Sequence, residues 1–463
     1  MLTWVLAIVM VPVAMGAWRP GQPSRGARSD AQPPAQSRGT DAAAKSKAQP
    51  QSTLQTDADA VPLAPGEWRV FVEPEGQIFP ALILATATLK KSIPSEQLPG
   101  ATTQKPAANS AKTKTTPAPL QPLVLGDPDS LIGVHLRAPA SGQFPCHVRV
   151  ELQANPLMDT AVLEAELPTA DREYLLQPTI AFNFDALGRV RQARPLNVAF
   201  HVVLDGHDLG QKIVTAEVHT INDCLYGYGD ADDKNHDHFQ DLTWMFAAYV
   251  NEDHPAVRAL LREAQNSGIT DAFDNYASGD PSQVLQQVWA LWDLLQTKDI
   301  RYADIGTTSS ESDLLWSMHV RFLDESLADG QVNCVDGSVL LASLLRKIGI
   351  QPFLVLEPGH MYLGFYLDRQ GRTSACLETT LLGAREEELG RWLPNRTLAK
   401  AVPPAARNRP SWKTFNAALD CATKEFRKYR RRYAKDDDPE YQTIDIAAAR
   451  HEGVMPIAAS LEK

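Results

Sequence analysis

The sequence predicts an α+β protein in which an N-terminal antiparallel β-sandwich precedes a domain built from helices and then strands. The chain has 463 residues, which is long enough for two or three domains. Between residues 123 and 222, short runs of alternating apolar and polar residues recur between turn-forming residues, as in half-buried strands. From residue 241 onward the apolar residues recur at helical spacing instead, until short strand-like runs follow residue 349.

The first 61 residues are expected to lie outside the folded domains. Residues 1–18 are almost uninterruptedly apolar and carry the small residues Ala14 and Gly16, a pattern typical of a signal peptide. Because no Lys or Arg precedes the apolar run, a signal anchor is the alternative. Residues 19–61 are rich in Pro, Ala, Ser and Gln and bury too little apolar surface to fold, which predicts a disordered linker. The protein is therefore expected to be exported, periplasmic or extracellular, and to contact a membrane only through this segment.

Residues 62–228 are expected to form the sandwich, with a disordered insert at residues 100–122, where Thr, Lys, Ala and Pro dominate. Turn signals such as Asp185 to Gly188 and the pair Asp205-Gly206 separate the strand-like runs. Short strands at this spacing are typical of an immunoglobulin-like sandwich. The predicted strands are Trp68–Val72, Ile78–Thr88, His147–Leu152, Thr160–Glu166, Thr179–Phe184, Leu196–Leu204 and Ile213–Thr220.

An acidic segment, DADDKNHDHFQD, follows the sandwich, and residues 229–240 are interpreted as an interdomain linker. The acidic positions resemble those of a calcium loop, but Lys234 stands at a ligand position and Asn235 replaces the turn glycine. His236 and His238 lack a third clear ligand for a transition metal. No metal site and no cofactor are predicted.

Residues 241–400 are expected to form the second domain, and residues 401–463 a helical extension after it. Gly349 stands where a glycine ends the last helix before the strands. The predicted helices are Asp241–Val250, Pro255–Ala264, Pro281–Thr297 and one that runs from Cys334 to Ile348. The predicted antiparallel strands are Pro352–Leu356, Met361–Leu367 and Thr373–Glu378, with the sequence DRQG as the turn between the last two.

The strongest functional signal is the order of Cys334, His360 and Glu378. Cys334 begins the predicted helix, where unsatisfied amides and the positive end of the helix dipole stabilise a thiolate. His360 opens the second strand and Glu378 ends the third, which would bring an imidazole base and a carboxylate that orients it to the thiol. Asp336 is expected to cap the helix N-terminus. Cys334, His360 and Glu378 are predicted to form a catalytic triad.

The segment NCVDGSVLLASLLRKIGIQPFLVLEPGHMYLGFY, with the CLETT sequence after it, resembles the core of the transglutaminase-like cysteine superfamily. The strong match covers residues 313–382, and a weaker one extends back to Phe239. The resemblance implies a papain-like/transglutaminase-like α+β fold for residues 241–400, with Cys334 as nucleophile and His360 as base. The family usually has Asp-Pro-Thr where this chain has Glu378-Thr379-Thr380.

The resemblance also implies that a polar donor or a tryptophan upstream of the nucleophile binds the tetrahedral oxyanion together with the Cys334 amide. Gln331 and Trp316 are the two candidates for this role. Solvation in a loop is the alternative for Gln331, and core packing is the alternative for Trp316.

These residues predict an exported cysteine enzyme that acts on amide bonds of proteins or peptides through a thioester acyl-enzyme. Hydrolysis is favoured, because transfer needs an amine site that no motif identifies. Two alternatives stay open: a protein-glutamine acyltransferase that cross-links its substrates, and a noncatalytic binding or scaffold protein with a relic cysteine site. Cell-envelope proteins or peptides are the expected substrates. A net charge of −11 argues against nucleic acid as a partner.

Export would place the five cysteines in an oxidising compartment. Cys146 would then pair with Cys224, and Cys376 with Cys421, leaving Cys334 as the free thiol. The alternative is that the cysteines stay reduced and buried.

Overall fold

The computed structural model describes residues 62–89, 121–229, 239–304, 312, 314–434 and 440–457. The predicted signal segment, the linker at residues 19–61, most of the predicted insert and the two histidines of the acidic segment lie outside these residues. The protein is mixed α+β, with about 34% helix and 30% strand, so the predicted fold class is confirmed at that level. Within the described ranges, no helix is long and apolar enough to cross a membrane.

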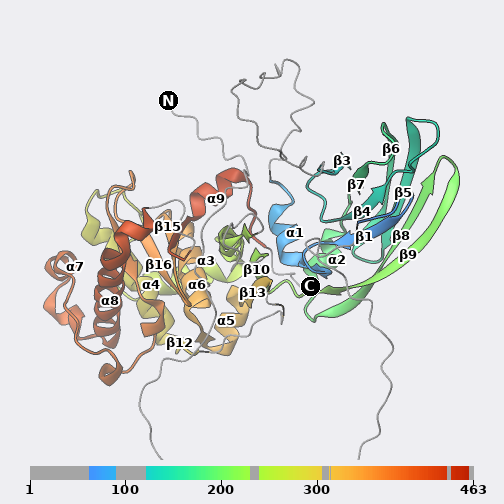
Figure 1. Ribbon diagram of the computed structural model, residues 1–463. Helices are drawn as coiled ribbons and strands as arrows, with labels where there is room; N and C mark the ends of the chain where they lie inside the picture. The colour runs from blue at the N-terminus through green and yellow to red at the C-terminus, as the bar shows by residue number, and fades with distance from the viewer. Residues whose placement is uncertain are drawn as a thin grey trace, which may run out of the picture.

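Two sheets share one core in the N-terminal part of the chain, at the right of Figure 1. Burial alternates along their strands, and in β5 the side chains of Val148, Val150 and Leu152 point into that core. The first sheet has the order β1 (Trp68–Val72), β4 (Ile132–Arg137), β7 (Glu173–Gln177) and β3 (Leu123–Gly126). The second has the order β2 (Gln77–Ile78), β9 (His207–Val218), β8 (Arg194–Leu204), β5 (Cys146–Ala154) and β6 (Met158–Leu167).

The sheets are not antiparallel throughout, because β2 pairs with β9, and β3 with β7, in parallel. The hairpin between β8 and β9 turns at the predicted pair, where Asp205 and Gly206 have φ angles of 46° and 76°. Positive φ at both positions suits a two-residue hairpin turn whose twist matches that of the strands.

Two predicted strands in this region are wrong. In place of a strand to Thr88, the chain forms only the short β2 and then a helix, α1 (Pro80–Thr86), which starts at a proline that has no N–H to lose. The strand predicted at Thr179–Phe184 is absent, and β7 lies just before it. There Asn183 accepts a hydrogen bond from the Ala186 N–H and caps α2 (Phe184–Gly188), so local capping outweighs the alternating pattern.

The remaining elements surround a second core, at the left and centre of Figure 1. One sheet there has the order β17 (Ser374–Leu377), β16 (His360–Tyr366), β15 (Pro352–Glu357) and β18 (Gln442–Asp445), and another the order β11 (Gln240–Asp241), β10 (Asp223–Tyr228) and β13 (Leu315–His319). A parallel pair joins β12 (Arg301–Tyr302) to β14 (Gln331–Val332). The α-helices are α3 (Pro255–Gln265), α4 (Pro281–Thr297), α5 (Leu323–Asp329), α6 (Cys334–Lys347), α7 (Arg396–Ala401), α8 (Pro410–Tyr433) and α9 (Ile446–Glu452). Four short 3₁₀ segments complete the description, η3 (Thr243–Tyr249), η4 (Thr379–Leu381), η5 (Glu386–Glu388) and η6 (Pro404–Asn408).

Helix α6 is the centre of this second core. Its side chains are buried on every face from Val335 to Leu345, as expected of a helix that packs on all sides. It contacts β15 and β16 on one side and α3, α4 and α5 on the others. The start of α6, its end before Gly349 and the bounds of α4 agree with the sequence predictions, whereas the first predicted helix is the 3₁₀ segment η3.

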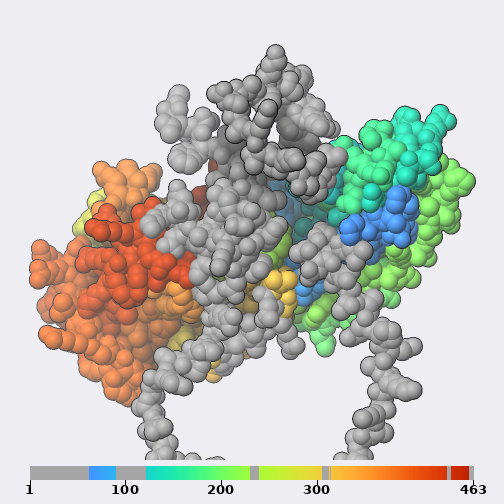
Figure 2. All heavy atoms as spheres, viewed as in Figure 1, coloured from blue at the N-terminus to red at the C-terminus, as the bar shows by residue number. Residues whose placement is uncertain are grey.

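The C-terminal residues are built into this core. Helix α8 packs on α4, where the indole N–H of Trp289 donates to Ser411 Oγ at 3.1 Å and that of Trp292 donates to Thr414 Oγ1 at 2.9 Å. Strand β18 adds an antiparallel edge to β15. The stretch expected as an extension therefore shares the sheet and core of the residues before it. Figure 2 shows most of these residues, orange to red, on the side of the molecule away from the N-terminal sheets, blue to green, whereas the chain after α9 reaches α1, where the Met455 N–H donates to the Ala85 carbonyl at 3.0 Å.

Candidate active site

The first turn of α6 is fixed by a reciprocal cap. Asn333 is the N-cap, and its Oδ1 accepts hydrogen bonds from the N–H groups of Val335 and Asp336, each at 2.9 Å. Asp336 returns a bond by accepting from the Asn333 N–H at 3.3 Å. The predicted capping role of Asp336 is thus shared: Asn333 is the cap and Asp336 its partner in a capping box. Cys334 is the first residue of the helix as a result.

Asp336 also forms a buried ion pair with Arg321. Its Oδ1 accepts from the Arg321 N–H at 2.9 Å, and its Oδ2 accepts from Nη1 at 2.8 Å. Burial raises the pKa of the Asp336 carboxyl, and the bonds from Arg321 and Asn333 oppose that rise. The hydrogen bonds around this carboxylate anchor the turn that carries Cys334 to the chain segment after β13.

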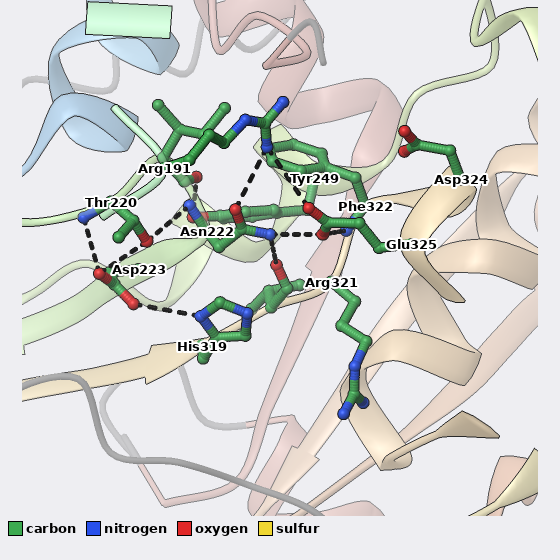
Figure 3. A network of polar contacts seen from close by, with 12 residues as sticks. Arg191, Thr220, Asn222, Asp223, Tyr249, His319, Arg321, Phe322, Asp324 and Glu325 are labelled. Carbon is green, nitrogen blue, oxygen red and sulfur yellow. Dashed lines mark hydrogen bonds and ion pairs between the residues drawn. The ribbon is translucent and has the colours of Figure 1, made fainter. Parts of the chain in front are cut away.

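That segment is in turn held by the end of the N-terminal sheets, as Figure 3 shows. The Asn222 side chain donates to the Val320 carbonyl at 3.0 Å and to Glu325 Oε2 at 2.6 Å. Arg191 donates to Asn222 Oδ1 at 3.3 Å and lies 3.4 Å from Glu325 Oε1, with its guanidinium 5.3 Å from the centre of the Phe322 ring. A continuous polar network therefore leads from the N-terminal sheets to the residue next to Arg321.

His360 opens β16 and faces the carboxylate of Glu378. The tight hairpin before it pairs Glu357 with His360 and turns at Gly359, whose φ is 71°. Nε2 of His360 lies 2.9 Å from Oε2 of Glu378. Burial opposes a charged imidazole, but the hydrogen bonds and charges of Cys334 and Glu378 outweigh it and raise the pKa of His360 to about 10.

Glu378 is held at both of its oxygens. It follows β17 and caps η4, where its Oε1 accepts from the Thr380 N–H at 3.1 Å and from the Thr380 hydroxyl at 2.8 Å. Burial raises the pKa of this carboxyl, but the contacts with His360 and Thr380 dominate and lower it. Glu378 is therefore ionised and oriented toward the imidazole.

Thr379, which stands where the family that the sequence resembles usually has proline, makes a contact of its own. Thr379 Oγ1 donates to the Cys334 carbonyl at 3.2 Å, and Ser338 Oγ donates to the same oxygen at 2.7 Å. Proline could not supply the first of these bonds. The Glu-Thr-Thr sequence thus ties the end of β17 to the turn of α6 that carries Cys334.

The structure brings Cys334, His360 and Glu378 together. Cys334 is half-buried, and its side chain lies close enough to the His360 ring to help raise the pKa of the imidazole. Because Nε2 of His360 bonds Glu378, Nδ1 is the ring nitrogen that is left for the thiol. A thiol, an imidazole and an ionised carboxylate in this order can generate a nucleophilic thiolate.

The two predicted oxyanion donors lie on two different strands. Gln331 is exposed on β14, paired with Arg301 of β12. Trp316 lies on β13 in a different sheet, where it meets the ring of Phe239 edge to face at a centroid distance of 6.2 Å. Neither contact tests the predicted catalytic role of either residue.

Sequence reasoning missed Tyr302, the second residue of β12. Burial raises the pKa of the Tyr302 phenol to about 12, and the neighbouring charges of Cys334, Asp304 and Glu378 add to that rise. The Tyr302 phenol is therefore within electrostatic range of Cys334 and Glu378. A two-residue strand leaves no periodic signal, so only tertiary structure could reveal it.

The predicted disulfides are wrong, because all five cysteines are free thiols. Cys146 belongs to the core of the N-terminal sheets and Cys224 to the second core, so each is packed within a different part of the protein. Cys376 is buried on β17, whereas Cys421 is exposed on α8. What distinguishes Cys334 is its contact with His360 and not the lack of a pairing partner.

No group of three or more His, Cys, Asp or Glu side chains in the described part of the chain is arranged to hold a metal ion. A comparison with protein-family models finds no match, and no curated protein matches the sequence.

Proposed function

We propose that the protein is an exported transglutaminase-like cysteine enzyme that acts on amide bonds of proteins or peptides through a Cys-His-Glu triad. The observation that carries this proposal is the position of His360, which is hydrogen-bonded to Glu378 and lies close enough to Cys334 for that side chain to raise the pKa of the imidazole. The finer fold assignment belongs to the same proposal. The two N-terminal sheets with one core support an immunoglobulin-like sandwich, and the Cys334 helix followed by the antiparallel strands of His360 and Glu378 supports a papain-like domain.

The reaction begins with the thiolate of Cys334 next to a protonated His360. The sulfur attacks the carbonyl carbon of the substrate, and the carbonyl π electrons move to the oxygen. When they return, the bond to the leaving nitrogen breaks and the nitrogen takes the proton of His360, which leaves a thioester on Cys334. Glu378 stabilises the imidazolium and holds the ring in one orientation throughout.

The fate of the thioester decides the class of enzyme. Water, deprotonated by His360, gives a peptidase or amidase, whereas an amine gives a protein-glutamine acyltransferase. We favour hydrolysis, because no feature within the described residues marks an amine-binding site. Export rests on the apolar residues 1–18, and it favours cell-envelope proteins or peptides as substrates.

The alkylation of Cys334 by iodoacetamide tests the proposal directly. The protein should carry Cys421→Ser, because Cys421 is the other thiol that is not buried. Alkylation near neutral pH should be rapid and confined to Cys334, and His360→Ala should slow it at least about tenfold, since the thiolate then lacks its imidazolium partner. His201→Ala is the matched control, because His201 is an exposed histidine that pairs with Asp208 far along the chain from the site.

Slow labelling that His360→Ala leaves unchanged would contradict the proposal and favour a noncatalytic scaffold with a relic site. A labelled primary amine offered together with a glutamine-containing peptide separates the remaining outcomes. Cys334-dependent incorporation of the amine would favour the acyltransferase over the hydrolase.

A further inference from the structure

The short strands β12 and β14 lie side by side, and β14 ends two residues before Cys334. They pair in parallel, with Arg301 opposite Gln331 and Tyr302 opposite Val332. The pairing is completed by hydrogen bonds from the Arg301 N–H to the Gly330 carbonyl and from the Ala303 N–H to the Val332 carbonyl, each at 3.0 Å. Residues opposite each other in such a ladder point to the same face of the sheet.

The two faces of this ladder have different surroundings. Arg301 and Gln331 are exposed, whereas Val332 is buried and Tyr302 is half-buried. Side chains along an extended chain alternate, so Cys334, two residues after Val332, continues the inner face through the extended backbone of Asn333. Tyr302 therefore shares a face with the nucleophile, and Gln331 points away from it.

The backbone of Tyr302 is also bound to the segment that follows Glu378. Its N–H donates to the Leu382 carbonyl at 3.1 Å, just after η4, the turn that Glu378 caps. Val332, on the inner face, is also close to η4. A β-carbon placed on Gly337 would lie 3.4 Å from Cγ2 of Val332 and 3.2 Å from Cβ of Thr379, the first residue of η4, so both side chains border the same small space. Tyr302 thus lies between the segment that leads into Cys334 and the segment that follows Glu378.

The Cys334 N–H points to a place for an oxyanion. In the first turn of α6 the N–H groups of Asn333, Val335, Asp336 and Gly337 all have acceptors. No described residue accepts from the Cys334 N–H, which leaves it for an oxygen of the substrate, as expected at the first position of a helix. An oxyanion needs a second donor, and a phenol that keeps its proton well above neutral pH is suited to the role.

We propose that Tyr302 is a catalytic residue whose hydroxyl, together with the Cys334 N–H, donates a hydrogen bond to the oxyanion of the tetrahedral intermediate. This inference rests on the proposed cysteine chemistry and replaces Gln331 and Trp316 in that role. As the sulfur bonds to the carbonyl carbon, the π electrons move to the oxygen between the two donors. They return when the leaving group departs, and Tyr302 keeps its proton throughout.

The test compares two reactions of Cys334 that differ in whether an oxyanion forms. Acylation by p-nitrophenyl acetate passes through one, whereas alkylation by iodoacetamide displaces iodide at a saturated carbon and does not. Tyr302→Phe should slow the burst of p-nitrophenolate about a hundredfold and leave the alkylation rate unchanged. Tyr429→Phe on α8 is the matched control, and Gln331→Ala tests the competing donor.

Two results would overturn the inference. One is acylation by Tyr302→Phe at the rate of the wild type, whether or not Gln331→Ala is slowed, and the other is an equal loss of acylation and alkylation in Tyr302→Phe. Each of these leaves the proposed cysteine chemistry standing as long as the wild type shows a burst that Cys334→Ser abolishes. A wild type without a burst would instead contradict the proposed function itself. Thermal unfolding of each variant checks that the fold is intact.

Discussion

Nε2 of His360 and Oε2 of Glu378 lie 2.9 Å apart, and the other oxygen of Glu378 is held by Thr380. The carboxylate therefore cannot turn away from the imidazole without losing the two bonds from Thr380. The Glu378 side chain is longer than that of an aspartate by one methylene group and therefore has one more rotatable bond. The two hydrogen bonds from Thr380 restrict that additional rotation.

Glu378→Gln should shift the pH profile of Cys334 alkylation to higher pH. The amide keeps the size of the side chain but removes the charge that stabilises the His360 imidazolium, so the pKa of His360 should fall toward its ordinary value of 6.5. We expect alkylation by iodoacetamide to be about tenfold slower at pH 7, because a change of one pKa unit corresponds to about 1.4 kcal/mol. Glu388→Gln, at an exposed pair with Arg385, is the control. Superimposable pH profiles of Glu378→Gln and the wild type would contradict this role.

The stability of the protein should fall at alkaline pH because of His360. Its folded-state pKa of about 10 lies above the ordinary value, so the imidazolium stabilises the folded protein fully below about pH 6.5. That contribution is lost as the pH rises through 10, with a slope of at most about 1.4 kcal/mol per pH unit. In His360→Ala, the free energy of unfolding measured with urea should therefore change less between pH 6.5 and pH 10 than it does in the wild type. His201→Ala should retain the wild-type slope, and an unchanged slope in His360→Ala would refute the prediction.

Arg321→Met should destabilise the protein strongly. The substitution leaves the buried carboxylate of Asp336 without its cation, and breaking one side of a buried ion pair typically costs about 3–5 kcal/mol. Arg321→Met combined with Asp336→Asn should cost less than Arg321→Met alone, because no unpaired charge is then buried and the amide oxygen can still accept a hydrogen bond from the backbone. Arg149→Met at an exposed pair with Glu164 should change the free energy of unfolding by less than about 1 kcal/mol. Equal losses for the buried and exposed arginines in chemical denaturation would contradict this account.

The sequence predicts well the parts of this protein that local patterns determine. The helix from Cys334 carries apolar residues at helical spacing, the strand from Pro352 is a continuous apolar run, and Gly349 adopts the positive φ of 81° that suits the end of a helix. The order of Cys334, His360 and Glu378 along those elements, together with the family resemblance, predicted that they lie close together, and in the structure His360 bonds Glu378.

Features that depend on distant contacts were not predictable in this way. Tyr302 belongs to a strand of two residues that exists only because β14 pairs with it. Asn333 looks no different in sequence from any polar residue before a helix, and its reciprocal bond with Asp336 became visible only in three dimensions. The polar residues of α8, such as Ser411 and Thr414, gave no sign that they accept hydrogen bonds from the buried tryptophans of α4.

Gly364→Ala should destabilise the sheet that carries His360. Gly364 lies on β16 directly opposite Phe353 of β15, and a β-carbon at that position would be 2.1 Å from Cε2 of the Phe353 ring. The ring is itself packed against Tyr366 and against Phe426 of α8, with centroid distances of 5.2 and 6.2 Å, so it cannot move without displacing the helix. We expect the free energy of unfolding to fall by about 2 kcal/mol, as is typical of an overpacked core.

Gly188→Ala is the matched control, because Gly188 ends the short helix α2 and no atom lies within 4 Å of the place that an alanine β-carbon would take there. That variant should be as stable as the wild type or slightly more so, since alanine restricts the unfolded chain. Phe353→Leu should recover part of the stability of Gly364→Ala, because the smaller side chain leaves room for the added methyl group. If Gly364→Ala and Gly188→Ala unfold at the same urea concentration, the Phe353 ring can adopt another position, and the close packing of β15, β16 and α8 does not hold the hairpin that carries His360 in place.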